Sequence, residues 1–189
     1  MATTGAPGGE ATIAAAVYAT TLVVMFGASA LYHRPNWSPT QARRFLQLDH
    51  TAIFLVIAGT ATPILLLTSH GALEVVMLTA VWAIALGGIV FEWLPLNPWR
   101  GYVTTVYLVL GWIGIVAIGG LWEHTGVAGV LLVIAGGVLY TAGAVVHATR
   151  RPDLWPHVFG YHELFHAFVI VAALLHYCAI AFLVLPLGS

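Results

Sequence analysis

The sequence carries histidines, a serine and an aspartate with the types and spacing that a metal centre needs. His162 and His166 lie four positions apart. On a helix they therefore share one face, about 6 Å apart along the axis. Two imidazoles one turn apart can chelate one cation, as in helical zinc sites. Ser29 and His33 have the same spacing, and Asp49 lies about one turn inside the next apolar stretch.

The chemistry that this set predicts is that of an open zinc site. The chain has a single cysteine, Cys178, so any zinc must be held by histidine and carboxylate ligands. Three neutral imidazoles would leave zinc a fourth position for water, and zinc lowers the pKa of such a water to about 7. We expect Asp49 to orient or deprotonate this water and Ser29 to hydrogen-bond to it or to a developing oxyanion. The predicted ligands are His33, His162 and His166.

The remaining histidines and glutamates fit other roles better. His50 neighbours Asp49 but points about 100° away around the helix. His176 shares a helix face with His162 but lies about 21 Å deeper, so we expect it to hydrogen-bond within the bundle. We expect the other polar candidates to lie at interfaces or in loops that water reaches: His70, His124, His147, His157, Glu74, Glu92 and Glu123.

The segment from His162 to His166 also fits the metalloprotease pattern H-E-x-x-H, in which the glutamate is the general base. Intramembrane zinc proteases take an aspartate ligand from another span. Here Asp49 lies upstream and lacks the Gly-rich context expected of that class. An intramembrane zinc protease is therefore the third hypothesis for this chain.

The bulk composition indicates that the elements positioning these residues lie in a membrane. Hydrophobic residues make up 60% of the chain, charged residues only 7%, and the mean hydropathy is +0.95. A soluble domain has about 25% charged residues. The net charge is −1 and there is no lysine, which excludes a basic surface for nucleic acid. The composition predicts an all-α polytopic membrane protein with a single domain over residues 1–189.

A helix needs about 20 apolar residues to cross the hydrocarbon core. Six stretches meet this length, at about 12–33, 44–68, 72–94, 101–121, 127–148 and 159–186. Turn-forming residues separate them at 35–39, 69–71, 94–98, 123–126 and 151–153. We therefore expect a bundle of six transmembrane helices.

The arginines orient this bundle. All six basic side chains fall between spans one and two, three and four, or five and six. Because basic loops stay in the cytoplasm, these loops are predicted to be cytoplasmic and the carboxyl terminus to lie outside. The end of span one and the starts of spans two and six then meet at one cytoplasmic depth. The candidate metal site lies there.

Three segments of the sequence resemble the hemolysin III family. They are Ser29–His33, Leu48–Phe54 and Tyr161–His166, and the likeness runs from about residue 14 to the end. The family is the bacterial branch of the progestin and adipoQ receptor proteins, which include the adiponectin receptors. It belongs to a wider group of membrane hydrolases that includes alkaline ceramidases. The shared pattern is Ser-x-x-x-His, an Asp on the next helix and His-x-x-x-His on the last.

The resemblance implies that His33, His162 and His166 are zinc ligands and that Ser29 and Asp49 lie next to the metal-bound water. It also implies seven spans with a cytoplasmic amino terminus, whereas this chain shows six. The absent span would precede residue 12, so we expect either a shortened member or a chain begun at a late start codon.

Three functions follow as hypotheses. The first is a zinc-dependent hydrolase of lipid amide bonds in the bacterial plasma membrane, with membrane lipids as substrate or ligand. The second is a non-enzymatic membrane sensor, receptor-like or lytic pore-forming protein in which zinc joins helices. The third is the intramembrane protease.

Overall fold

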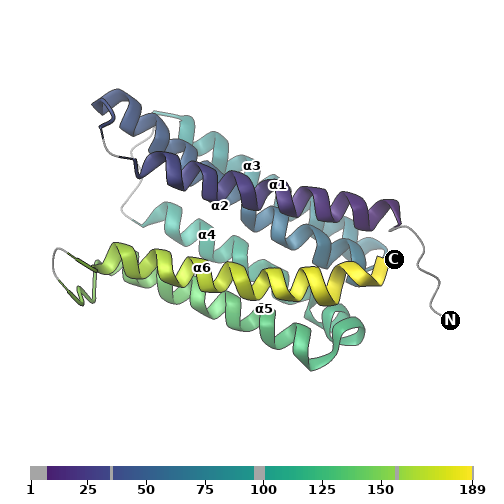
Figure 1. Cartoon of the computed structure of the whole chain (residues 1–189). Helices are drawn as coiled ribbons and strands as arrows, with labels where there is room; N and C mark the ends of the chain where they lie inside the picture. The colour runs from purple at the N-terminus through teal and green to yellow at the C-terminus, as the bar shows by residue number, and fades with distance from the viewer. Residues whose placement is uncertain (1–7, 35, 96–100, 156–157, 189) are drawn as a thin grey trace.

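The computed structural model describes residues 8–34, 36–95, 101–155 and 158–188, and this part of the chain is almost entirely helical (Figure 1). The α-helices are α1 (Gly9–Tyr32), α2 (Pro39–Thr68), α3 (Ala72–Trp93), α4 (Tyr102–Ile113), α5 (Ile118–Thr149) and α6 (Tyr161–Ala179). Short segments extend them: η1 (Gly114–Ala117) precedes α5, and η2 (Ile180–Val184) and η3 (Leu185–Gly188) follow α6. The predicted all-α membrane fold is confirmed.

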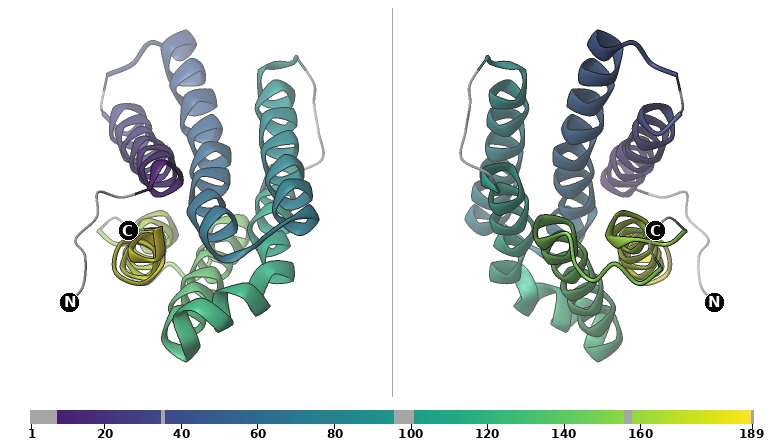
Figure 2. Two further views of the ribbon diagram at one scale, coloured as in Figure 1. Left: turned by 90° about the vertical axis from the view of Figure 1, so that its right-hand side faces the viewer. Right: turned by 90° about the vertical axis from the view of Figure 1, so that its left-hand side faces the viewer.

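The helices run back and forth along one axis. Figure 2 shows α1 and α6 on one side of the bundle, α3 and α4 on the other, and α2 between them. The first and last described residues meet at one end, where the Gly8 N–H donates a hydrogen bond to the Gly188 carbonyl at 2.7 Å. The α1–α2 turn and the α5–α6 connection lie at the opposite end (Figure 1). This opposite end therefore gathers the arginines of both connections.

The described helices contain five stretches that are long and apolar enough to cross a membrane. The fourth stretch, Tyr102–Thr149, has 48 residues and covers the predicted span 127–148 and all but the first residue of the predicted span 101–121. Its helical path is broken at Gly126, which has φ 64° and ψ −162°, a conformation open to glycine. The break falls inside the turn predicted at 123–126. An integral membrane protein is confirmed, while the count of six crossings stays a prediction.

Helix α2 begins five residues before the predicted start at 44. Ser38 caps it, because the Ser38 hydroxyl accepts from the Gln41 N–H at 3.4 Å and the Gln41 side chain accepts from the Ser38 N–H at 3.1 Å. Pro39 then occupies the first helical position, where its missing N–H costs nothing. The helix extends beyond the predicted span because hydropathy locates apolar residues, whereas capping residues decide where a helix starts.

Packing between helices depends on small residues and aromatic rings. Phe54, Ala58 and Leu65 of α2 are buried against Val81 and Ala85 of α3 in one core cluster. A second cluster joins Met25 of α1 to Ala52 and Val56 of α2. At the end far from the arginines, a Cβ at Gly120 would meet the backbone carbonyl of Thr68. The close approach of α5 to the end of α2 therefore requires glycine there.

Large apolar side chains cover the outside of the bundle. Val23 is 72% exposed, Leu131 62% and Phe182 67%. In water such a surface would be an aggregation hazard, whereas in a bilayer the lipid tails cover it. The outward-facing residues therefore agree with the membrane assignment.

Candidate metal centre

The three predicted ligand histidines converge at the arginine-rich end of the bundle. The Nε2 atom of His166 lies 3.1 Å from Nε2 of His162 and 3.2 Å from Nε2 of His33. The ligand atoms of all three residues lie within 4.8 Å of one another. The structure thus brings together side chains from the end of α1 and the start of α6 that could hold one metal ion.

The spacing of these nitrogens fits a tetrahedral metal. Zinc–nitrogen bonds of about 2.0–2.1 Å at tetrahedral angles place two nitrogens about 3.3–3.4 Å apart. Two of the three separations, at 3.1 and 3.2 Å, are close to that value, and the ligand atoms of all three residues lie within 4.8 Å of one another. Hydrogen bonds among neutral imidazoles explain the cluster less well, because one Nε2 proton of His166 can be donated to only one of its two neighbours. A cation at the centre would engage all three lone pairs.

Local sequence sets the position of each ligand. His33 is the residue that ends α1, and its N–H donates to the Ser29 carbonyl at 3.0 Å. At the other side of the site, α6 begins after Gly160, whose N–H donates to the Glu163 carboxylate at 2.9 Å. This bond fixes the first turn of α6, so that His162 and His166 project from successive turns of one face.

Asp49 and Ser29 lie next to the cluster. The Ser29 hydroxyl is a hydrogen-bond partner of the Asp49 carboxylate, and His33 and His162 lie within electrostatic range of Asp49. Because α2 begins at Pro39, Asp49 lies almost three turns inside the helix and not one turn as the hydropathy boundary suggested. The aspartate thus approaches the cluster from the middle of a rigid element.

The cluster is accessible at the end of the bundle. His33 is exposed, whereas His162 and His166 are partly buried. A cavity of about 250 Å³ borders His162 and is lined by Asp153, Val158, Gly160, Tyr161 and Glu163. The cluster is therefore not sealed inside the bundle, since one ligand residue is exposed and another borders a cavity.

The other histidines are separate from the cluster or border it. His176 Nε2 lies 3.0 Å from the Val133 carbonyl, which confirms the predicted hydrogen bond within the bundle. The ring of His147 lies 5.9 Å from that of His162 and borders the site. His70 and His124 are exposed and lie against each other, with ring centroids 5.8 Å apart. His157 lies outside the described residues.

Sequence reasoning missed one polar pair near the site. Glu92 lies near the end of its span, as expected, and its side chain is 13% exposed and lies 2.9 Å from His50 Nδ1. The pairing itself was not predicted, because the two residues are 42 positions apart and meet only in the folded bundle. The available signal was that both are ionisable residues near the same end of neighbouring spans.

Comparison with known proteins adds an independent line of evidence. The model of the family described as "Haemolysin-III related" matches residues 1–177. Hemolysin-3 of Bacillus cereus is 35% identical over 180 residues, covering 95% of this chain and 79% of the relative. The hemolysin-3 homolog of Bacillus subtilis (strain 168) is 32% identical over 170 residues, covering 89% and 76%.

A plant relative extends the similarity beyond bacteria. The heptahelical transmembrane protein ADIPOR2 of Oryza sativa subsp. japonica is 32% identical over 153 residues, covering 72% of this chain and 66% of the relative. The family match includes all three histidines of the cluster, Ser29 and Asp49. On this match, and on the two Bacillus relatives, the chain belongs to the haemolysin III-related family of integral membrane proteins.

Proposed function

We propose that this protein is a zinc-dependent membrane hydrolase that cleaves amide bonds of membrane lipids. The observation that carries the proposal is the convergence of the His33, His162 and His166 nitrogens beside Ser29 and Asp49. Three histidine ligands leave a tetrahedral metal one open position, which is the arrangement of catalytic zinc. The adjacent carboxylate and hydroxyl supply the proton acceptor and the hydrogen-bond donor that hydrolysis needs beside the metal.

Each residue has a defined task in this reaction. Zinc, when bound, would polarise the substrate carbonyl and acidify the water at the open position. Asp49 accepts a proton from the attacking water as the C–O bond forms, and delivers that proton to the amine nitrogen as the C–N bond breaks. Ser29 donates a hydrogen bond to the carbonyl oxygen while negative charge develops there. The products are a carboxylic acid and an amine.

The surroundings of the cluster favour a lipid substrate. The ligands lie at the ends of apolar helices, where the polar part of a lipid meets the acyl region. The exposed side of His33 and the cavity beside His162 give the carbonyl a route in, while the acyl chain stays against the apolar surface of the bundle. The choice of an amide follows from the shared residue pattern with alkaline ceramidases.

The proposed location is the bacterial plasma membrane, with the metal centre near the cytoplasmic face. Arg34, Arg150 and Arg151 lie at the same end of the bundle as the cluster. The positive-inside rule then makes that end cytoplasmic and the carboxyl-terminal end external.

A non-enzymatic function is the alternative. The Bacillus relatives are named hemolysin-3, and the rice relative carries the name of an adiponectin-receptor-like protein. A lytic, sensing or receptor-like protein would need the metal only to join α1 to α6. The protease hypothesis is favoured less, because the glutamate of its motif, Glu163, is engaged by the Gly160 N–H.

The test combines metal analysis with a substrate panel. The purified protein would be analysed for zinc and incubated with ceramide-type amides, ester lipids and a casein-type protein substrate, as wild type and as Asp49→Asn. The hydrolase proposal expects about one zinc per chain and release of fatty acid from the amide by wild type alone. Bound zinc with no turnover of any lipid would reject the hydrolase proposal in favour of a metal that only joins α1 to α6. Cleavage of the protein substrate would favour the protease.

A further inference from the structure

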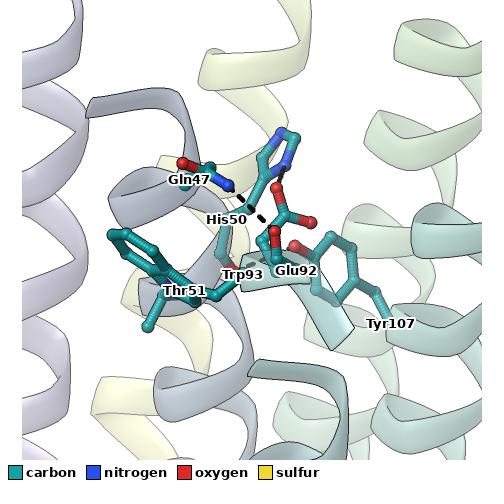
Figure 3. A network of polar contacts seen from close by, with 6 residues as sticks. All are labelled: Gln47, His50, Thr51, Glu92, Trp93 and Tyr107. Atoms are coloured by element: carbon teal, nitrogen blue, oxygen red, sulfur yellow. Dashed lines mark hydrogen bonds and ion pairs between the residues drawn. The ribbon is translucent and has the colours of Figure 1, made fainter. Parts of the chain in front are cut away.

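A partly buried polar pair joins α2 to α3 (Figure 3). His50 Nδ1 lies 2.9 Å from the Glu92 carboxylate, and their side chains are 29% and 13% exposed. The Gln47 side-chain amide donates to the backbone carbonyl of the same glutamate at 3.0 Å. Glu92 is thus fixed by its side chain and its backbone to two residues of one helical turn.

Two more hydrogen bonds hold this turn of α2. The Tyr107 hydroxyl of α4 donates to the backbone carbonyl of His50 at 2.9 Å (Figure 3). The Trp93 indole N–H donates to the Thr51 hydroxyl at 3.0 Å. Tyr107 is itself oriented by the ring of Phe54, at a centroid distance of 4.5 Å. Side chains from both α3 and α4 therefore converge on residues 47–51.

The turn that these contacts hold is the one that carries Asp49. Gln47, His50 and Thr51 share one face of α2 at spacings of three and four. Asp49 projects roughly 150° away from that face. The contacts to α3 and α4 thus hold the face of the turn that carries Gln47, His50 and Thr51. Asp49 lies on the opposite face, toward Ser29 and the cluster histidines.

Apolar packing would join α2 to α3 without any charged residue, and it does so along the rest of their contact. Partly buried ionisable groups in a membrane are expensive and often contribute little net stability. A directional polar pair adds to apolar packing because it fixes the rotation of a helix about its axis and its position along that axis. A functional group has to be held within about 0.5 Å and 10–20° of its working position.

We propose that Glu92, acting through His50, is a positioning residue for the metal centre: it fixes the rotation of α2 that holds Asp49 against the histidine cluster. This inference rests on the metal centre of the proposed function but not on the hydrolase reaction. Among the described residues, Glu92 makes no hydrogen bond or ion pair with Asp49 or with the cluster histidines His33, His162 and His166, so its effect passes through the 47–51 turn.

The test is a double-mutant cycle with metal affinity as its readout. Glu92→Gln would be made in wild type and in an Asp49→Asn background, and the dissociation constant for Zn²⁺ measured by competition with a chelator. Glu92→Gln is expected to weaken zinc binding about tenfold in wild type, at the low end of the effect of outer residues on metal sites. In the Asp49→Asn background the same change is expected to have less than about a twofold effect, because the group being positioned is gone.

A spectroscopic readout accompanies the affinity. With Co²⁺ in place of Zn²⁺, Glu92→Gln is expected to shift the visible absorption bands of wild type and leave those of the Asp49→Asn protein unchanged. Tyr107→Phe removes the hydrogen bond to the His50 carbonyl while keeping the aromatic ring, so it provides the same test if Glu92→Gln does not fold. Its expected effect has the same direction and is smaller.

The matched control is Thr62→Val. Thr62 accepts a hydrogen bond from the Trp82 indole at 3.1 Å and so also joins α2 to α3, but about 20 Å from Asp49 along the helix. It should lower thermal stability without changing metal affinity. An equal loss of affinity on Glu92→Gln in both backgrounds, or no loss in wild type, would overturn the positioning role. Wild-type protein that binds zinc but hydrolyses no lipid would overturn the hydrolase alone, and wild-type protein that binds no metal would overturn both.

Discussion

The Glu163 carboxylate accepts a hydrogen bond from the Gly160 N–H at 2.9 Å. This bond begins α6 and uses the residue that a metalloprotease of the H-E-x-x-H type would need as its general base. Glu163 also follows His162 directly, so it projects about 100° away from the ligand face. The same five-residue segment therefore supports a metal site and offers little support for a protease.

Replacing Glu163 distinguishes these two uses. Glu163→Gln retains a side-chain acceptor for the Gly160 N–H, so zinc content and lipid turnover are expected to stay within a few-fold of wild type. A protease base cannot be replaced by an amide, so the protease hypothesis expects abolished activity. Turnover and metal content of the purified variant decide between them.

Removing the metal is expected to destabilise the protein. A ligand present at about 100 times its dissociation constant stabilises the folded state by about 2.7 kcal/mol. Adding a strong chelator should therefore lower the melting temperature of wild type in detergent. The chelator should leave His166→Ala unchanged, since that variant has lost a ligand. His70→Ala, at the other end of the bundle, is the control and should respond as wild type does.

Asp49 and Ser29 are expected to affect turnover more than metal binding. Asp49→Asn should lower kcat about 10²–10⁴-fold, the usual contribution of a general acid–base group. Ser29→Ala should lower kcat about 10²-fold, as loss of an oxyanion donor does. Both variants should still bind zinc when the metal is in excess, as measured by elemental analysis, although the affinity of Asp49→Asn for zinc is expected to fall about tenfold. If either variant bound no zinc, that residue would be needed for metal binding and not only for the reaction.

A pair of neighbouring glycines tests the packing of α5 against α2. A Cβ at Gly120 would meet the Thr68 carbonyl, whereas one at Gly119 would meet nothing within 4 Å. Gly120→Ala is expected to destabilise the bundle by about 1–3 kcal/mol, the usual cost of overpacking. Gly119→Ala should be neutral or slightly stabilising. Thermal unfolding in detergent measures both, and equal stabilities would contradict the close approach.

Cysteine labelling tests the proposed orientation. Cys178 would first be replaced by serine, and single cysteines introduced as Thr40→Cys at the arginine-rich end or His70→Cys at the other, both at exposed positions. An impermeant maleimide added to intact cells should label position 70 only. Labelling of position 40 alone would show that the protein has the opposite orientation, with the metal centre on the outside of the cell.

The sequence predicted the helical membrane fold because hydropathy and helix length are local properties. It also predicted which histidines meet, since the i, i+4 spacing of His162 and His166 and the alternation of spans limit the arrangement strongly. The start of α2 was missed because Ser38 and Gln41 cap it outside the apolar stretch. The pairing of His50 with Glu92 was missed because the relative rotation of two helices is decided by packing, which no single span encodes.

The histidine cluster also bears on how the protein is made. His33 and His166 are 133 positions apart, and their Nε2 atoms lie 3.2 Å apart in the folded bundle. During synthesis the first ligand is inserted into the membrane long before the last two emerge from the ribosome. The metal centre can therefore form only after α6 has been synthesised, so metal capture would follow the insertion of all the helices that precede α6.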